Sequence, residues 1–99
     1  MEKRSPHCKL SKIKALIEAE KVRSTQSALA GAAALGLDFL EMLDVVRELK
    51  ITDFYKSMTT HANHQIWQDV YRPMTKAGSV YLKLTVIEDV LIVSFNKEL

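Results

Sequence analysis

Four polar residues in the second half of the chain are of the types needed to hold and cleave a phosphodiester: Lys56, Gln68, Arg72 and Tyr81. Lys and Arg supply positive charge for a phosphate, and Gln can orient a hydroxyl group or a phosphate oxygen. Tyr81 can exchange a proton or stack on a base. Cleavage of RNA without a metal requires a base for the 2′-hydroxyl, a cation for the pentavalent phosphate and an acid for the leaving 5′-oxygen. These side chains can supply all three, although the same residue types also serve simply as solvent-facing strand residues.

Two segments, residues 53–60 and 66–73, predict the neighbouring β-strands that hold three of these candidates. Both mix aromatic and β-branched residues with polar residues at alternating positions, which a strand sends to opposite faces of its sheet. Strict alternation predicts one shared face for Phe54, Lys56 and Met58 in the first strand. In the second strand it groups Ile66, Gln68, Val70 and Arg72 on one face, and Trp67, Asp69 and Tyr71 on the other. One face can then form core while the other binds a phosphate.

The histidines and the single cysteine invite other kinds of chemistry. His61 and His64 lie in a loop without a Cys, an Asp or a third His at ligand spacing, so an idle or RNA-contacting role is favoured over a metal site. His7, in the N-terminal arm, is expected to be exposed and without a partner. Cys8 has no neighbouring motif that supplies a general base, and we expect a small side chain at a helix start. Trp67 is expected to anchor the core or pack across strands.

Helical patterns occupy the first half of the chain. Amphipathic spacing predicts a helix over about residues 9–20, followed by a short strand at 22–24. Ser24 or Thr25 can cap a second helix that runs to Leu35, with Gly36 as its left-handed stop. Asp38 and Glu41 then form a capping-box pattern for a third helix, whose apolar face is formed by Phe39, Met42, Leu43, Val46 and Leu49.

Past Lys50 the hydrophobic period changes to two, which predicts antiparallel strands and therefore an α+β domain with its N-terminal helices packed on a twisted antiparallel sheet. A tight turn at Glu88-Asp89 pairs the last two strands with position numbers that sum to 177. The apolar face then pairs Leu82 with Phe95, Leu84 with Val93, and Val86 with Leu91. The reverse face pairs Tyr81 with Asn96, Lys83 with Ser94, and Thr85 with Ile92.

Bulk properties limit the class of protein. The 99 residues are 47% hydrophobic and 26% charged, which is typical of one globular domain spanning residues 1–99 rather than of a disordered chain. We find neither an apolar stretch of membrane-spanning length nor a signal-peptide core, and we expect a cytoplasmic protein with no membrane association. A lone cysteine fits a reducing compartment.

The net charge of +2 is unevenly distributed. Residues 1–14 carry five Lys or Arg against one Glu, whereas residues 15–53 carry four against seven acids. Such a basic arm beside a mildly basic sheet suits a transient contact with a polyanion. An arm whose charges are simply solvated would explain this charge distribution equally well.

The segments 53–60 and 66–73 resemble the MqsR family of bacterial toxins, which belongs to the RelE-like mRNA interferases. The resemblance covers nearly the whole chain and includes residues 1–4, 36–39, 80–83 and 89–95. It implies a RelE-like toxin fold and a sequence-selective endoribonuclease that cleaves mRNA at short GC-containing triplets, with no metal or other cofactor. It also implies a cognate MqsA-like antitoxin with a zinc-binding domain and a helix-turn-helix DNA-binding domain.

The resemblance also assigns roles to individual residues. The proposed active-site Lys, Gln and Tyr of the family fall on Lys56, Gln68 and Tyr81, with Tyr55 and Met58 beside them. Further RNA contacts are expected from Arg72, Lys83 and Lys97. Two positions depart from the family: Asn96 stands where a terminal Lys can occur, and Glu88 stands where a His is found near the last turn. A non-catalytic RNA-binding or partner-binding module, in which the same residues only grip phosphates, is the alternative function.

Overall fold

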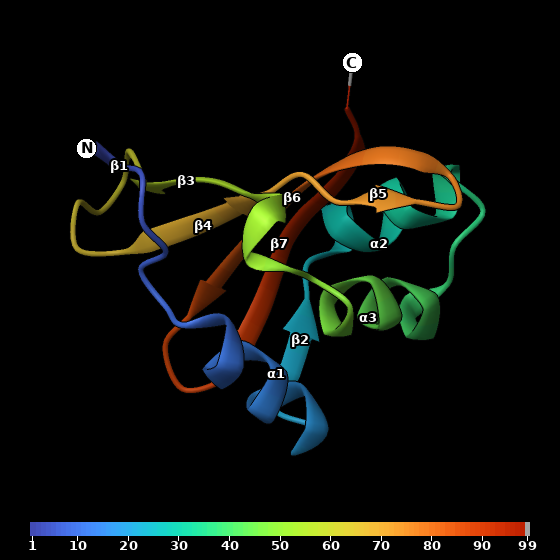
Figure 1. Ribbon diagram of the computed structural model, residues 1–99, viewed down its shortest axis with the longest axis horizontal. Helices are drawn as coiled ribbons and strands as arrows, with labels where there is room; N and C mark the ends of the chain where they lie inside the picture. The colour runs from blue at the N-terminus through green and yellow to red at the C-terminus, as the bar shows by residue number, and fades with distance from the viewer. Residues whose placement is uncertain (99) are drawn as a thin grey trace.

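Three helices form in the first half of the chain, where the apolar periodicity and the capping residues predict them. They are α1 (Leu10–Glu18), α2 (Gln26–Ala34) and α3 (Phe39–Arg47), as Figure 1 shows for the computed structural model, which describes residues 1–98. None of them is long and apolar enough to cross a membrane. The Thr25 hydroxyl caps α2 by accepting the N–H of Ala28 at 3.0 Å, and Gly36 ends it with a left-handed φ of 79°.

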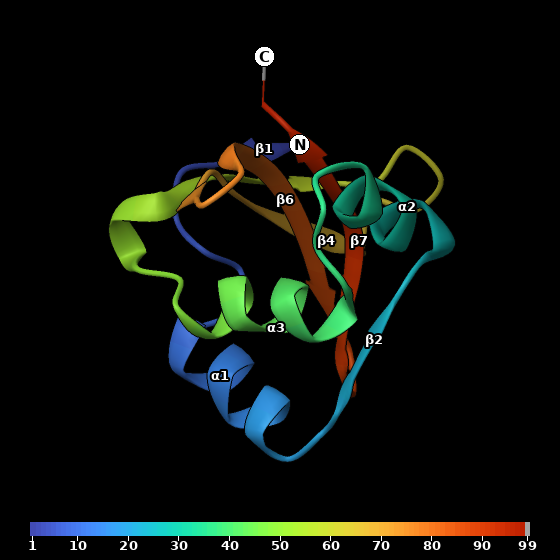
Figure 2. The ribbon, with the colours of Figure 1, turned by 90° about the vertical axis from the view of Figure 1, so that its right-hand side faces the viewer.

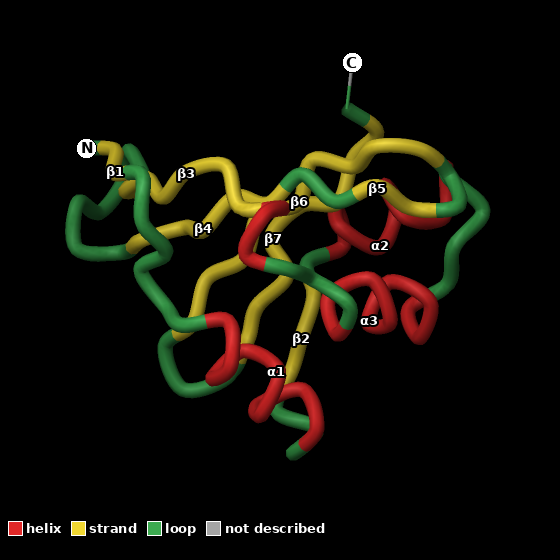
Figure 3. The backbone as a smooth tube through the Cα atoms, viewed as in Figure 1, coloured by secondary structure: helices red, strands yellow, loops and turns green. Residues whose placement is uncertain are grey.

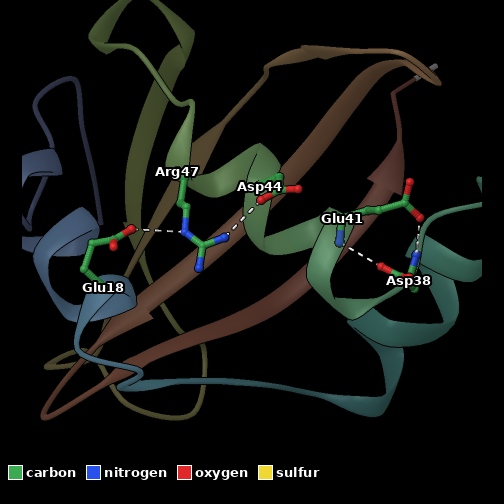
Figure 4. A network of polar contacts seen from close by, with 5 residues as sticks. All are labelled: Glu18, Asp38, Glu41, Asp44 and Arg47. Carbon is green, nitrogen blue, oxygen red and sulfur yellow. Dashed lines mark hydrogen bonds and ion pairs between the residues drawn. The ribbon is translucent and has the colours of Figure 1, made fainter.

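Polar contacts fix the start of α3 and join its end to α1 (Figure 4). Asp38 accepts the N–H of Glu41 at 2.8 Å, and the Glu41 carboxylate accepts the N–H of Asp38 at 3.1 Å, which completes the predicted capping box. In the last turn, Arg47 donates to Glu18 of α1 at 3.2 Å and to Asp44 at 3.0 Å. The two helices are thereby held side by side.

The strands form one sheet in the order β1-β3-β4-β6-β7-β2, with β5 paired to β6 outside this path. Their bounds are β1 (Glu2–Lys3), β2 (Val22–Ser24), β3 (Phe54–Thr59), β4 (Trp67–Tyr71), β5 (Met74–Thr75), β6 (Gly78–Val86) and β7 (Val90–Lys97). A short 3₁₀ helix, η1 (Ile51–Asp53), precedes β3. The pairs are antiparallel as predicted, except that β2 runs parallel to β7. The α+β class and the predicted strand at residues 22–24 are confirmed.

Helix α2 covers the edge of β7 beyond the end of β2 (Figure 2). Thr25 starts this arrangement, because its N–H binds the Ile92 carbonyl at 3.0 Å and its hydroxyl donates to the Val93 carbonyl at 2.7 Å. Gly31 makes the closest approach, since a Cβ atom there would lie 2.0 Å from the Phe95 carbonyl oxygen. Only a glycine therefore allows the helix to lie this close to the strand.

The core lies between the helices and one face of the sheet. From the sheet it takes Leu82, Leu84, Ile92 and Phe95, all fully buried. The helices contribute Ile13, Ile17, Ala28, Ala32, Met42, Leu43 and Val46, with Leu49 just beyond α3. Phe39 is only partly buried, so the predicted apolar face of α3 is confirmed with one residue at its margin. The sheet therefore has one face against the helices and one face free of them.

The predicted register of β6 and β7 is correct at the open end and wrong near the turn. Tyr81 pairs with Asn96, Leu82 with Phe95, and Lys83 with Ser94, as predicted. Beyond Lys83 the register shifts by one, so that Leu84 pairs with Ile92, Thr85 with Leu91, and Val86 with Val90. The extra residue, Val93, is a bulge that turns Ile92 into the core, and the turn spans Ile87–Asp89 instead of two residues.

Candidate functional site

The face of the sheet away from the helices gathers the polar residues that the sequence singles out. One row of paired residues crosses four strands: Lys56 on β3, Val70 on β4, Lys83 on β6 and Ser94 on β7. The neighbouring row pairs Met58 with Gln68, and Tyr81 lies on the other side of the first row. Paired residues share a face, so the structure brings Lys56, Gln68 and Tyr81 onto the same surface.

A β-bulge at Tyr55 places a second aromatic residue on this surface, beside Tyr81. The β3–β4 register skips one residue between Phe54, which pairs with Tyr71, and Lys56, which pairs with Val70. The prediction that Phe54 shares a face with Lys56 is therefore wrong, because the bulge turns Phe54 toward the core, where its ring meets Tyr71 edge-on at 5.4 Å. The Tyr55 ring instead lies 6.4 Å from the Tyr81 ring, edge to face.

Cations surround this pair of tyrosines. Measured to the centroid of the Tyr55 ring, the Arg72 guanidinium lies at 4.8 Å, the Lys56 ammonium at 5.3 Å and the Arg4 guanidinium at 5.7 Å. The Lys83 ammonium lies 6.0 Å from the centroid of Tyr81. Positive charges beside half-buried aromatic rings are suited to single-stranded nucleic acid, because the charges attract phosphates and the accessible part of each ring can stack on a base. We call these six residues the cationic face.

Lys56 is paired with an acid from the N-terminus of the chain. Its ammonium donates to the Glu2 carboxylate at 2.6 Å, with the Lys56 side chain only 19% exposed. This hydrogen bond raises the pKa of Lys56 above its ordinary value and lowers the pKa of Glu2. Lys56 is thus held as a cation and is a poor general base in this arrangement. Neither Glu2 nor Arg4 was singled out from the sequence, because β1 is too short to show a strand pattern.

Arg72 is also paired with an acid. It forms an ion pair with Glu98, whose other carboxylate oxygen accepts the Ser79 hydroxyl at 2.6 Å. The Ser79 hydrogen bond and the Arg72 charge together lower the pKa of Glu98. A recess of about 260 Å³ opens here beside Tyr55 and is lined in part by Arg72, Ser79 and Glu98. The cationic face therefore ends in a polar hollow.

A larger groove of about 670 Å³ lies elsewhere, between α3 and β5. Its walls include four carboxylates, from Glu41, Asp44, Glu48 and Asp53. Its two lysines are Lys50 and Lys76, and Lys76 is already paired with Glu41 at 2.5 Å. Clustered carboxylates repel RNA phosphates. Despite its size, this groove is a poor site for a nucleic acid.

The N-terminal arm is pinned to the sheet by a buried acid on the opposite face of β4. Asp69, 4% exposed, accepts the backbone N–H groups of His7 at 2.9 Å and Cys8 at 3.0 Å. The hydroxyl of Ser57, fully buried on β3, also donates to it. The arm runs from β1 past β4 to α1 (Figure 3). The sequence holds one indication of these contacts: alternation puts Asp69 on the core-facing side of its strand, and a buried carboxylate needs hydrogen-bond donors.

The expectation that His7 has no partner is wrong. Its ring stacks on Trp67 at 5.3 Å, and the Lys3 ammonium lies 4.3 Å from the centroid of the same indole. Trp67 thus anchors the arm. Its own side chain lies on the core-facing side of β4, where it is paired with Thr59 of β3. Burial raises the pKa of the Cys8 thiol, so Cys8 stays protonated near neutral pH and is a poor nucleophile.

The remaining predicted residues lie at the ends of strands and in loops. Asn96 is opposite Tyr81, whereas Lys97 pairs with buried Val80 and is directed to the other side of the sheet. Glu88 is exposed in the β6–β7 turn. His61 and His64 are exposed in the β3–β4 loop, and within residues 1–98 no three His, Cys, Asp or Glu side chains group closely enough to hold a metal.

Two comparisons with known proteins agree with one another. The family described as "Motility quorum-sensing regulator, toxin of MqsA" matches residues 5–97 of the chain. The chain is also 59% identical over 98 residues to a protein of Escherichia coli (strain K12) named mRNA interferase toxin MqsR. That alignment covers 99% of this chain and all of the relative. Both matches include the strands that carry the cationic face.

Proposed function

The chain belongs to the MqsR toxin family, and we propose that it is an endoribonuclease whose substrate is messenger RNA. The observation that carries this proposal is the cationic face itself, where Lys56, Arg72 and Tyr81 lie around the Tyr55 ring. A half-buried tyrosine pair among cations can hold splayed bases and the phosphates between them, as recognition of single-stranded RNA requires. Cleavage at short GC-containing triplets is the sequence preference that we expect.

The reaction is an attack by the ribose 2′-hydroxyl on the adjacent phosphorus. A bond forms between the 2′-oxygen and phosphorus while the bond from phosphorus to the 5′-oxygen breaks, which leaves a 2′,3′-cyclic phosphate and a 5′-hydroxyl. A base takes the 2′-hydroxyl proton, and an acid returns a proton to the leaving 5′-oxygen. The step consumes no water, metal or redox partner.

Each candidate residue has a role in this step that its surroundings support. The raised pKa of Lys56 suits a cation that stabilises the pentavalent phosphate or donates a proton, and does not suit a base. Gln68, in the row next to Lys56, can orient the 2′-hydroxyl or a phosphate oxygen. Tyr81 has a hydroxyl that can pass a proton and a ring that can stack. Tyr55, Met58, Arg72 and Lys83 are proposed RNA contacts. Lys97 is directed to the other side of the sheet, so we propose for it only a weak, salt-dependent contribution to RNA binding.

We also propose a protein partner. The matching family is described as the toxin of MqsA, so a cognate antitoxin of that type is expected to neutralise this chain. By the resemblance, that antitoxin has a zinc-binding domain that contacts the toxin and a separate DNA-binding domain. We place both proteins in the cytoplasm, where messenger RNA is translated.

A non-catalytic RNA-binding module is the competing function, and one observation favours it: the hydrogen bond to Glu2 raises the pKa of Lys56, so this lysine can grip a phosphate but is a poor general base for cleavage. Incubation of the purified protein with a defined RNA in EDTA separates the two. We expect cleavage, with mass spectrometry showing a 2′,3′-cyclic phosphate on one fragment and a 5′-hydroxyl on the other. Intact RNA would favour the binding module, and a 5′-phosphate would indicate hydrolysis by an activated water.

A further inference from the structure

The ion pair between Glu2 and Lys56 puts an anion where the proposed reaction needs one. The Glu2 carboxylate lies 2.6 Å from the Lys56 ammonium. A carboxylate oxygen and a phosphate oxygen accept the same charge-assisted hydrogen bond from an ammonium, at similar distances. The Glu2 side chain is 54% exposed whereas that of Lys56 is 19% exposed, so the acid is the member of the pair with more free space to turn into.

The backbone beside Glu2 is fixed even though its side chain is exposed. Glu2 pairs with Met58 across β1 and β3, and the Met1 carbonyl accepts the N–H of Thr59 at 3.0 Å. Further along the arm, the N–H groups of His7 and Cys8 are bound to Asp69. The carboxylate can therefore leave Lys56 by side-chain rotation, but the strand that carries it stays in place.

We propose that Glu2 occupies, in the free protein, the place on Lys56 that the scissile phosphate takes in the RNA complex. This inference rests on the proposed function of the cationic face. Binding of RNA then requires the Glu2 carboxylate to turn away. Because β1 is anchored, the displaced charge stays within the Debye length of the phosphate, about 8 Å at physiological salt, and continues to repel it. Glu2 thus weakens the affinity for RNA without taking part in the chemistry.

The charges around Glu2 allow this exchange. Arg4 is near enough to contribute to the lowered pKa of Glu2, so a cation remains beside the carboxylate after it leaves Lys56. The ammonium of Lys56 has three N–H donors, and Glu2 uses one of them. The phosphate can begin to bind before the acid has left.

The test compares Glu2→Gln with Glu48→Gln in untagged protein. Both variants remove one negative charge, but Glu48 lines the acidic groove beside α3. We would measure the Kd for an RNA that carries a 2′-deoxy sugar at the cleavage position, and kcat and KM for the cleavable RNA, at two salt concentrations. For Glu2→Gln we expect Kd and KM about fivefold lower at low salt, in line with one exposed ion pair, with kcat within about twofold of the parent. Glu48→Gln should change Kd and KM by less than about twofold. At the higher salt concentration, the Kd of Glu2→Gln should move closer to that of the parent protein, because salt screens the repulsion between Glu2 and the phosphate.

Two results of the RNA measurements would overturn the inference. A lower kcat with unchanged KM in Glu2→Gln would mean that the acid orients Lys56 for the reaction, and equal effects of the two variants would mean that only net charge matters.

A second experiment does not depend on RNA cleavage: binding of inorganic phosphate is followed through the Lys56 side-chain signals in NMR spectra. Tighter phosphate binding by Glu2→Gln in a protein that cleaves no RNA would support the exchange at Lys56 while refuting the proposed function. Unchanged phosphate binding would refute the exchange itself.

Discussion

The Asp69 carboxylate on β4 accepts the backbone N–H of His7 at 2.9 Å, which ties the N-terminal arm to the middle of the sheet. The same carboxylate accepts the N–H of Cys8 and the hydroxyl of Ser57. Because the arm also carries Glu2 and Arg4, an acid on the core side of the sheet helps to position residues at the cationic face.

Asp69→Ala should therefore destabilise the protein and free the arm. The substitution leaves the Cys8 N–H without its acceptor, while the His7 N–H keeps only the Ser57 hydroxyl and that hydroxyl keeps only the Ser5 carbonyl. We expect a loss of about 2 kcal/mol in the free energy of unfolding. Urea unfolding measures this loss, and hydrogen exchange of residues 2–8 should become faster. Asp44→Ala, which removes an exposed acid on α3, is the matched control and should cost well under about 1 kcal/mol. Equal stability of the two variants would show that the arm is held by other contacts.

Lys56→Ala and Gln68→Ala should fold normally and lose most RNA cleavage. Both side chains lie on the face of the sheet away from the helices, so truncation leaves no cavity in the core. Loss of a cation that stabilises the transition state should lower kcat by about 10²-fold. Lys21→Ala, at an exposed lysine next to β2, removes the same charge far from the cationic face and should retain activity. Full growth inhibition by a well-folded Lys56→Ala protein would contradict the assignment.

Tyr81→Phe separates the two roles open to Tyr81. Phenylalanine keeps the ring that faces Tyr55 and removes only the hydroxyl. We expect RNA affinity within about twofold of the parent and a cleavage rate lower by about 10²-fold, because the proposed step needs a proton path. Single-turnover cleavage and binding to the 2′-deoxy RNA measure the two quantities separately. A cleavage rate equal to that of the parent would assign Tyr81 to stacking alone.

Asn96→Lys should leave cleavage intact or raise it, whereas Lys97→Ala should change little beyond salt-dependent binding. Asn96 lies across from Tyr81, so a lysine there adds a cation to the cationic face, while Lys97 is directed to the other side of the sheet. Cleavage rates at two salt concentrations test both. A severe loss of RNA cleavage in Lys97→Ala would mean that the end of β7 rotates when RNA binds and brings Lys97 to the cationic face.

Gly31→Ala should be among the most damaging substitutions in the helices. Its Cβ would lie 2.0 Å from the Phe95 carbonyl, so α2 would have to move off β7, and we expect a cost above about 2 kcal/mol. Gly36→Ala is the matched control, because no atom lies within 4 Å of its Cβ and only the left-handed φ opposes it, at about 1 kcal/mol. Thermal unfolding of the two proteins ranks them, and the reverse order would contradict the close packing of α2 on β7.

Local patterns in the sequence were sufficient for most of the fold. The helix caps and the stop at Gly36 depend on residues a few positions away. Asp38 and Gly36 act as predicted, and of the two candidates for the cap of α2, Ser24 and Thr25, the structure uses Thr25. Alternation in the strands correctly separated Lys83 and Tyr81 from Leu82 and Leu84, because one face of a sheet against helices must be apolar. The resemblance pointed to Lys56, Gln68 and Tyr81, and their shared face follows from the same alternation.

Only the tertiary structure decided the bulges and the contacts of the N-terminal arm. Alternation cannot show an extra residue, and the bulges at Tyr55 and Val93 form where packing of Phe54 and Ile92 into the core outweighs a regular ladder. The pairing of Glu2 with Lys56 joins residues 54 positions apart. It exists because β1 pairs with the edge of β3, and two strand residues are too few to carry a periodic signal. The sequence therefore predicted which residue types form the site, whereas only the tertiary structure showed that Glu2 is paired with Lys56, because that contact depends on how distant segments pack.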